Sequence, residues 1–171
     1  QLEHPFIGMM MNDAYSQIAQ SFRGNAKVIA AVDEWALRQT HHEVELARVS
    51  SIASTPTLKT ILLRQLESSS FPHWPADALR DGWGMADSEV GTALRAVAMG
   101  DVRRASRIAN LIPNILPDAK EARDRLIEIL RAPNNQRPDF VLSALRDLPH
   151  ATEADDEIVN LRFQNGDGRL L

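Results

Sequence analysis

The sequence predicts an all-α protein built of stacked helix–turn–helix pairs. Apolar residues recur at spacings of three and four through most of the chain after residue 25, and Pro, Gly and Asp residues stand where such helices would begin and end. No alternating strand pattern bounded by hairpin turns occurs in the sequence. Because each pair is too short to bury its apolar faces alone, the pairs are expected to stack as an α-solenoid. A closed bundle of the same helices is the alternative.

The composition narrows the class of protein. The chain has 171 residues, 44% hydrophobic and 25% charged, which is enough to build a buried core. Its 19 Lys and Arg residues against 23 Asp and Glu residues give a net charge of −4, so no overall basic field would recruit nucleic acid or an anionic membrane. The absence of cysteine excludes disulfides and thiolate metal sites.

Neither a membrane span nor a signal peptide is predicted. No apolar run reaches the roughly 20 residues that cross a bilayer, and the first residues lack the basic-then-apolar layout of a signal peptide. A cytoplasmic protein is therefore expected. The chain begins with Gln1 and stops soon after an Asn-Gly-Asp-Gly turn at 165–168, which favours a fragment of a longer protein.

Residues 1–54 are expected to form a helical lead-in that packs on the array. Residues 1–12 have no clean period, and helical patterns follow at about 13–22 and 25–38. A less regular apolar stripe covers residues 44–53. A clearer helix then begins, with Thr55 as its cap and Pro56 in its first turn. The residues expected on its buried face are Leu58, Ile61, Leu62 and Leu66.

Residues 71–98 predict a helix, a tight turn and a second helix. Pro75 suits the first helical turn, and Gly82 and Gly84 are expected to take left-handed turn angles. Asp87 is expected to cap the second helix. The whole stretch therefore has the signals of one repeat unit.

Two further helix pairs follow in degenerate form. One predicted helix runs from about 101 to a stop near Pro113, with Val102, Ala105, Ile108, Ala109 and Ile112 along one face. The second helix of this pair begins at 117–118, with Glu121 and Arg125 as an i,i+4 ion pair on its solvent-exposed side. A third pair is predicted at 138–148 and about 153–164. The second helices begin near residues 87, 118 and 155, so the repeats would occupy residues 55–165, with a tail at 166–171.

Two short patterns resemble HEAT repeats. The segments DSEV at 87–90 and, more faintly, DEIV at 156–159 look like the second helix of such a repeat. The longer stretch FPHWPADALRDGWGM at 71–85 resembles the helical sensor region of bacterial NACHT-type STAND NTPases. This resemblance covers about residues 55–165 and implies a ligand-sensing solenoid in a regulatory or defence protein. The chain lacks the phosphate-binding G-x-x-x-x-G-K-[ST] motif, so the nucleotide-hydrolysing domain would lie outside it.

The only cluster with catalytic residue types is His41, His42, Glu43 and Glu45. A zincin needs two histidines four positions apart on one helix face, whereas the position four after His42 is Leu46. A solvated helix start is the favoured interpretation. A metal-assisted all-α enzyme or a nucleotide-responsive domain, with its site near His41 and His42, is the alternative.

Two sets of residues are candidates for binding a partner. Arg103, Arg104 and Arg107 would cluster opposite the apolar face of their helix and hold a phosphate or an acidic loop, although a solvated face balanced by Asp101 is favoured. Trp74 and Trp83, with Phe71, would form an aromatic recognition pocket, although packing in the core between helix pairs is favoured. The carboxylates Asp118, Glu121, Asp124 and Glu128 have the pattern of surface salt bridges.

The sequence therefore predicts a non-catalytic helical-repeat scaffold that holds a protein partner or ligand on its surface. No cofactor, no metal and no membrane association are expected. The sequence carries no strong nucleic-acid signal, and it leaves the oligomeric state open.

Overall fold

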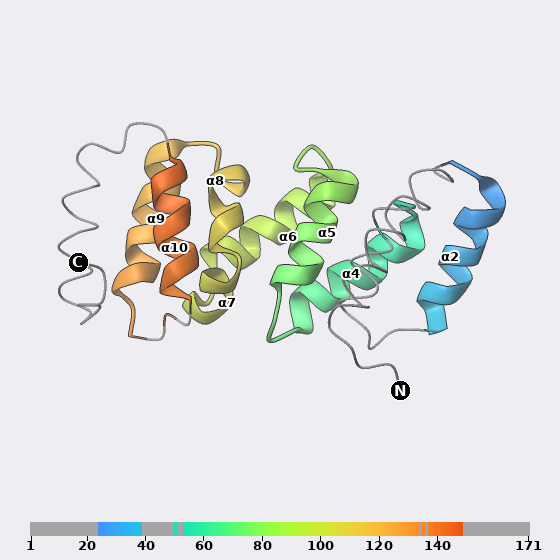
Figure 1. Ribbon diagram of the computed structural model, residues 1–171, viewed down its shortest axis with the longest axis horizontal. Helices are drawn as coiled ribbons and strands as arrows, with labels where there is room; N and C mark the ends of the chain where they lie inside the picture. Colours follow the sequence, from blue (N-terminus) through green and yellow to red (C-terminus); the bar gives the residue numbers. More distant parts are fainter. Residues whose placement is uncertain (1–23, 39–49, 51–52, 134, 136, 149–171) are drawn as a thin grey trace, which may run out of the picture. The chain divides into compact units, whose positions relative to one another are not determined.

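A computed structural model describes residues 24–38, 50, 53–133, 135 and 137–148. Within these ranges every regular element is a helix and none is a strand, which confirms the all-α prediction (Figure 1). The elements are α2 (Ala26–Arg38), α4 (Pro56–Ser68), α5 (His73–Trp83), α6 (Ser88–Met99), α7 (Val102–Arg107), the 3₁₀ turn η1 (Ala109–Leu111), α8 (Ile112–Ile115), α9 (Ala119–Arg131) and α10 (Pro138–Asp147).

The chain forms two compact units. Unit 1 comprises residues 1–69 and 74–90, and unit 2 comprises residues 70–73 and 91–171, so the boundary falls within α6. The predicted helices at 13–22 and 153–164, the stripe at 44–53 and the tail at 166–171 lie wholly or mostly outside the described residues.

In unit 1, the start of α4 joins this helix to α2. The hydroxyl of Thr55 accepts a hydrogen bond from the backbone N–H of Leu58 at 3.2 Å, and Pro56 occupies the first turn, as predicted. The same hydroxyl donates to the carboxylate of Asp33 in α2. The expected apolar face is buried: Leu58, Ile61, Leu62 and Leu66.

The turn between α5 and α6 is built from one glycine and one carboxylate. Gly84 has φ of 73°, and its N–H donates to the carbonyl of Arg80 at 2.9 Å, which closes the end of α5. Asp87 caps α6 as predicted, because its Oδ1 accepts from the N–H groups of Glu89 and Val90, both at 3.1 Å. Gly82 was expected in a left-handed turn but lies inside α5. A Cβ there would lie 3.1 Å from Ser54 Oγ, so close approach favours glycine at this position.

In unit 2, the single helix predicted over 101–112 is wrong. It breaks into α7, η1 and α8, with Ile108 at φ −114° and ψ 19° between the first two. Pro113 accounts for the break, because its ring would collide with the carbonyl of Ala109 if one α-helix continued. Pro113 instead lies in the first turn of α8. The apolar face still packs inward, since Ala105, Ile108, Ala109 and Ile112 are all fully buried.

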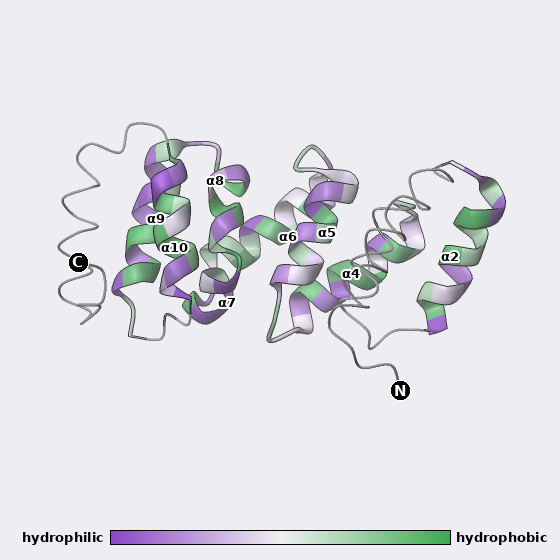
Figure 2. Ribbon diagram, viewed as in Figure 1, coloured by the Kyte–Doolittle hydropathy of each residue, from purple (hydrophilic) through white to green (hydrophobic). Residues whose placement is uncertain are grey.

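The helix α9 begins where the sequence predicts. Asp118 Oδ1 accepts from the N–H of Glu121 at 2.8 Å. Hydrophobic and hydrophilic residues alternate in bands along α9 and α10, as in amphipathic helices (Figure 2). The buried residues of α9 include Ala122, Leu126, Ile129 and Leu130. Those of α10 are Val141, Leu142, Ala144 and Leu145.

The predicted surface pair between Glu121 and Arg125 is wrong. Arg125 is only 5% exposed, because it lies three positions after Ala122 and four before Ile129, on the buried side of α9. Its Nε donates to the carbonyl of Ala98 at 2.7 Å, and its Nη2 donates to the carbonyl of Gly100 at 2.5 Å. Its Nη1 pairs with Glu128 at 2.7 Å. One guanidinium therefore ties α9 to the C-terminal end of α6.

We expect Arg125→Lys to lower the free energy of unfolding by about 1–3 kcal/mol. One ammonium group cannot make all the hydrogen bonds that the guanidinium donates to two carbonyls and a carboxylate. Urea unfolding followed by circular dichroism measures the change. Lys120→Ala is the control, since that side chain is 86% exposed, and a change within about 0.5 kcal/mol is expected. Equal stability of the two variants would contradict the structural role of Arg125.

Candidate interaction surface

A basic and aromatic surface in unit 2 contains all three arginines of α7. We call Arg103, Arg104, Arg107 and Phe71 the Arg–Phe surface. The guanidinium carbon of Arg107 lies 4.0 Å from the centre of the Phe71 ring, which is a cation–π contact. Phe71 is 51% exposed, Arg103 is exposed, and Arg104 and Arg107 are half-buried. The surface therefore places positive charge directly beside an apolar ring.

The local fold explains why Arg103 is exposed, whereas Arg104 and Arg107 are half-buried and the Nε of Arg104 is a buried atom. Asp101 starts α7 by accepting from the N–H groups of Arg103 at 3.0 Å and Arg104 at 3.2 Å. The opposite side of α7 packs inward through Ala105 and Ser106, which are both fully buried. The carboxylate of Asp101 is thus bound by the backbone, and within the described ranges no carboxylate pairs with the side chain of Arg103.

The two tryptophans do not form one pocket. Trp74 and Trp83 lie nine positions apart in α5, which at about 100° per residue puts them on opposite sides of the helix. Trp74 is 39% exposed and Trp83 is half-buried, so the favoured placement of the aromatics in the core is wrong for Trp74, as it is for Phe71. The buried side of α5 is instead made of small residues and one leucine: Pro75, Ala76, Ala78 and Leu79.

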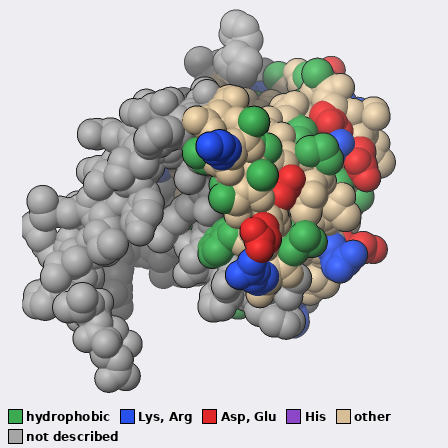
Figure 3. Space-filling view, turned by 90° about the vertical axis from the view of Figure 1, so that its right-hand side faces the viewer, with side chains coloured by type: hydrophobic (Ala, Val, Ile, Leu, Met, Phe, Trp, Pro, Cys, Tyr) green, Lys and Arg blue, Asp and Glu red, His purple; other side chains and the backbone are tan. Residues whose placement is uncertain are grey.

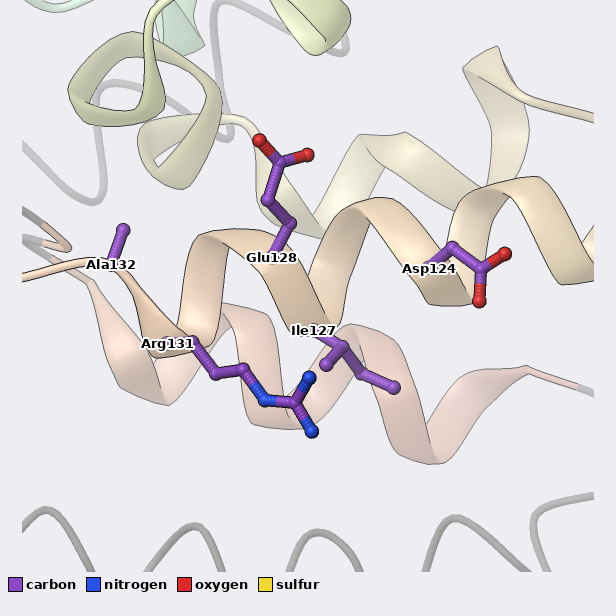
Figure 4. Close-up of a pocket in the computed structure, with 5 residues that line it drawn as sticks. All are labelled: Asp124, Ile127, Glu128, Arg131 and Ala132. Atoms are coloured by element: carbon purple, nitrogen blue, oxygen red, sulfur yellow. The ribbon is translucent and has the colours of Figure 1, made fainter.

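A shallow hollow of about 530 Å³ lies on the surface of α9. Asp124, Ile127, Glu128 and Arg131 line it, followed by Ala132 after the helix end. Figure 4 shows that Glu128 points away from Ile127 and Arg131, so the side chains do not converge on one point. Because its lining comes from α9 and the residue that follows it, this hollow does not enclose a small molecule as a catalytic cleft would.

Of the four carboxylates predicted to form surface salt bridges, Asp124 and Glu128 do so. Asp118, Glu121, Asp124 and Glu128 are all exposed. Asp124 pairs with Lys120 at 3.1 Å, and Glu128 pairs with Arg125. These carboxylates also line a second hollow of about 340 Å³ beside Met99. Asp124 and Glu128 are surface salt-bridge partners and Asp118 is a helix cap, so these carboxylates do not form a desolvated acid–base pair.

In unit 1, Asp87 binds a cation while it caps α6. Lys59 Nζ lies 2.7 Å from Asp87 Oδ2 and 3.0 Å from Glu89 Oε2. The hydrogen bond from Lys59 is the main reason that the pKa of Asp87 falls below its ordinary value. The same hydrogen bond is the main reason that the pKa of Lys59 rises. The charged forms of both groups therefore favour the folded state.

The face of the molecule that carries α2 shows no dense patch of one kind. Figure 3 shows hydrophobic side chains there scattered among separate acidic and basic groups. Leu37, for example, is 62% exposed beside the ion pair of Glu34 and Arg38. Isolated exposed apolar residues of this sort are ordinary on protein surfaces.

The alternative metal site lies outside the described residues, since His41, His42, Glu43 and Glu45 all fall in the range 39–49. Where the structure describes the chain, no group of three or more His, Cys, Asp or Glu side chains is arranged to hold a metal. None of the helices in those same ranges has both the length and the apolar character needed to cross a bilayer.

Sequence analysis missed two features of unit 2. The stack of Arg107 on Phe71 joins residues 36 positions apart, so the spacing of nearby residues cannot predict it. The burial of Arg125 has a signal in the sequence, because it shares the spacing of Ala122 and Ile129.

Comparison with protein-family models, with curated proteins and with solved structures gave no match to this chain. Function is therefore inferred from the sequence pattern and from the geometry described above.

The pair of Lys59 and Asp87 predicts a pH dependence. Because the pKa of Asp87 is lower in the folded state, its contribution to stability is present above the ordinary carboxyl pKa of about 3.9 and is lost as the pH falls through the folded value. Asp87→Asn keeps a side-chain acceptor for the helix start but removes the charge.

We therefore expect the wild type to be more stable than Asp87→Asn between about pH 5 and pH 7, with the difference shrinking below about pH 4 as the pH falls through the lowered pKa of Asp87. Thermal unfolding at a series of pH values measures it. Glu67→Gln is the control, because that exposed carboxylate lies near the C-terminal end of α4 and caps no helix. A stability difference that stays constant into acid would show that the charge of Asp87 plays no part.

Proposed function

We propose that the chain is a non-catalytic helical scaffold, a segment of a HEAT-like α-solenoid that holds a protein partner or ligand on its surface. The observation that carries this proposal is the neighbour pattern in unit 2. There α10 packs against α9 and also against α7, η1 and α8, the helical segment before α9. In stacked helix pairs, a helix typically packs against the preceding helix and also against the helix that comes before that.

The surfaces support binding rather than catalysis. In the described ranges the hollows are open and lie along α9, and the carboxylates around them are exposed. The Arg–Phe surface, in contrast, offers charge and an apolar ring together. Such a combination suits a protein contact, in which arginine and aromatic side chains are enriched.

The wider setting comes from the resemblance of residues 71–85 to the sensor region of bacterial NACHT-type STAND NTPases. The glycine turn at Gly84 and the cap at Asp87 support the helix–turn–helix unit on which that resemblance rests. We propose that the scaffold belongs to a cytoplasmic regulatory or defence protein. There it would sense a ligand and control a nucleotide-driven switch located elsewhere.

Hydrogen exchange distinguishes an array from a closed bundle. In an array each helix pair depends mainly on its neighbours, so Ile129→Ala in α9 should remove protection from unit 2 much more than from α2 and α4. Leu62→Ala, at an equally buried position in α4, is the matched control and should show the reverse pattern. Equal loss of protection in both units for both variants would favour a single closed bundle.

Zinc titration tests the non-catalytic part of the proposal. Calorimetry of the full chain with Zn²⁺ should show no tight stoichiometric binding. Tight binding that His42→Ala abolishes would overturn the scaffold and favour the metal-assisted enzyme. A Glu121→Gln variant controls for weak binding of Zn²⁺ to exposed carboxylates of α9.

A further inference from the structure

We infer that the Arg–Phe surface is the docking site for an acidic segment of a partner protein that also carries an apolar side chain. The inference rests on the proposed function, because it names the kind of partner that the scaffold would hold.

Charge supplies the first argument. Unit 2 as a whole is neutral in sequence, with 12 Lys and Arg residues against 12 Asp and Glu, so the positive charge of the Arg–Phe surface is local to α7. Within this unit Arg103 and Arg107 lie four positions apart in α7, so their side chains share one side of the helix. Two like charges at this spacing repel each other. A carboxylate of a partner can pair with Arg103, whose side chain has no carboxylate partner among the described residues.

The carboxylate next to α7 in sequence, that of Asp101, is not available to pair with the arginine side chains of α7. Asp101 is bound by the backbone at the start of α7, and in the part of the chain that the structure describes the side chain of Arg103 pairs with no carboxylate. The α7 N-terminus is therefore already capped. Recognition of an anion here depends on the arginine side chains.

Phe71 supplies the third argument. About half of its surface is exposed, at 51%, and Arg107 lies over its ring at 4.0 Å. A guanidinium stacked on a ring donates its N–H groups within its own plane, so stacking is compatible with binding a carboxylate. The stack also holds the cation next to the apolar surface. A ligand that fits both must combine a carboxylate with an apolar group.

A protein segment fits this surface better than a nucleic acid does. Single-stranded nucleic acids bind along basic grooves that present several aromatic rings, whereas the Arg–Phe surface has one. The exposed carboxylates of the same unit, three within α9 and Asp118 at its start, disfavour binding of a long polyanion. A short acidic segment needs only the few charges of α7.

The test is a titration of the full ¹⁵N-labelled chain, followed by NMR at the arginine Nε–Hε groups. The probes are the peptide Gly-Glu-Glu-Phe-Glu-Glu-Gly, its glutamine counterpart Gly-Gln-Gln-Phe-Gln-Gln-Gly, and a short oligothymidylate. We expect the acidic peptide to shift the signals of Arg103 and Arg107, and to bind more tightly than either of the other probes. Added salt should weaken this binding.

Three variants locate the site. Arg103→Gln and Phe71→Ala should each weaken binding of the acidic peptide by about fivefold or more, as expected when a charge-assisted hydrogen bond or an apolar contact is lost. Arg95→Gln is the matched control, because Arg95 is an exposed arginine of α6 in the same unit but outside the Arg–Phe surface. Its affinity should stay that of the wild type.

The inference is overturned if millimolar acidic peptide leaves the arginine signals unshifted, or if the glutamine peptide binds equally well. Tighter binding of oligothymidylate, or an equal loss in Arg95→Gln, overturns it as well. These outcomes leave the scaffold itself intact, because different results contradict it: tight zinc binding that depends on His42, or equal loss of protection in both units. The two proposals can therefore fail separately.

Discussion

The buried guanidinium of Arg125 is the contact on which the packing of unit 2 depends. A cation that is 5% exposed is tolerated only when its donors are satisfied, and here two carbonyls at the end of α6 and the carboxylate of Glu128 satisfy them. Any shift of α9 along α6 would leave a buried charge without its acceptors. The apolar stripe of α9 packs against α7, α8 and α10, and Arg125 adds the tie to the end of α6.

Unit 1 uses helix caps in a similar way. Thr55 caps α4 and also donates to Asp33 of α2, while Asp87 caps α6 and also binds Lys59 of α4. Each of these polar side chains therefore fixes the start of its own helix and its position against another helix. Short helices gain more from such caps than long ones do, because a larger share of their N–H groups lies at the ends.

Features that depend on neighbouring residues were predictable from the sequence. The caps at Thr55, Asp87 and Asp118 are local patterns, and the buried face of α4 follows from its spacing. The break at Ile108 was missed because the apolar spacing continues through Pro113, although the proline ring forbids one continuous helix. The stack of Arg107 on Phe71 and the exposure of Trp74 depend on tertiary packing, which spacing alone does not encode.

Because Arg125 binds backbone carbonyls, its contact with α6 would be hard to detect by comparing related sequences. Its guanidinium binds the carbonyls of Ala98 and Gly100, and a carbonyl is present whatever side chain occupies those positions. The hydrogen bond itself therefore does not depend on the side chain at residue 98, although Ala98 is fully buried and leaves no room for a larger one. Methods that find contacts from correlated substitutions would overlook this pairing between α6 and α9, even in a deep alignment. Gly100 carries a constraint of its own, since a Cβ there would lie 2.7 Å from the carbonyl oxygen of Ala96.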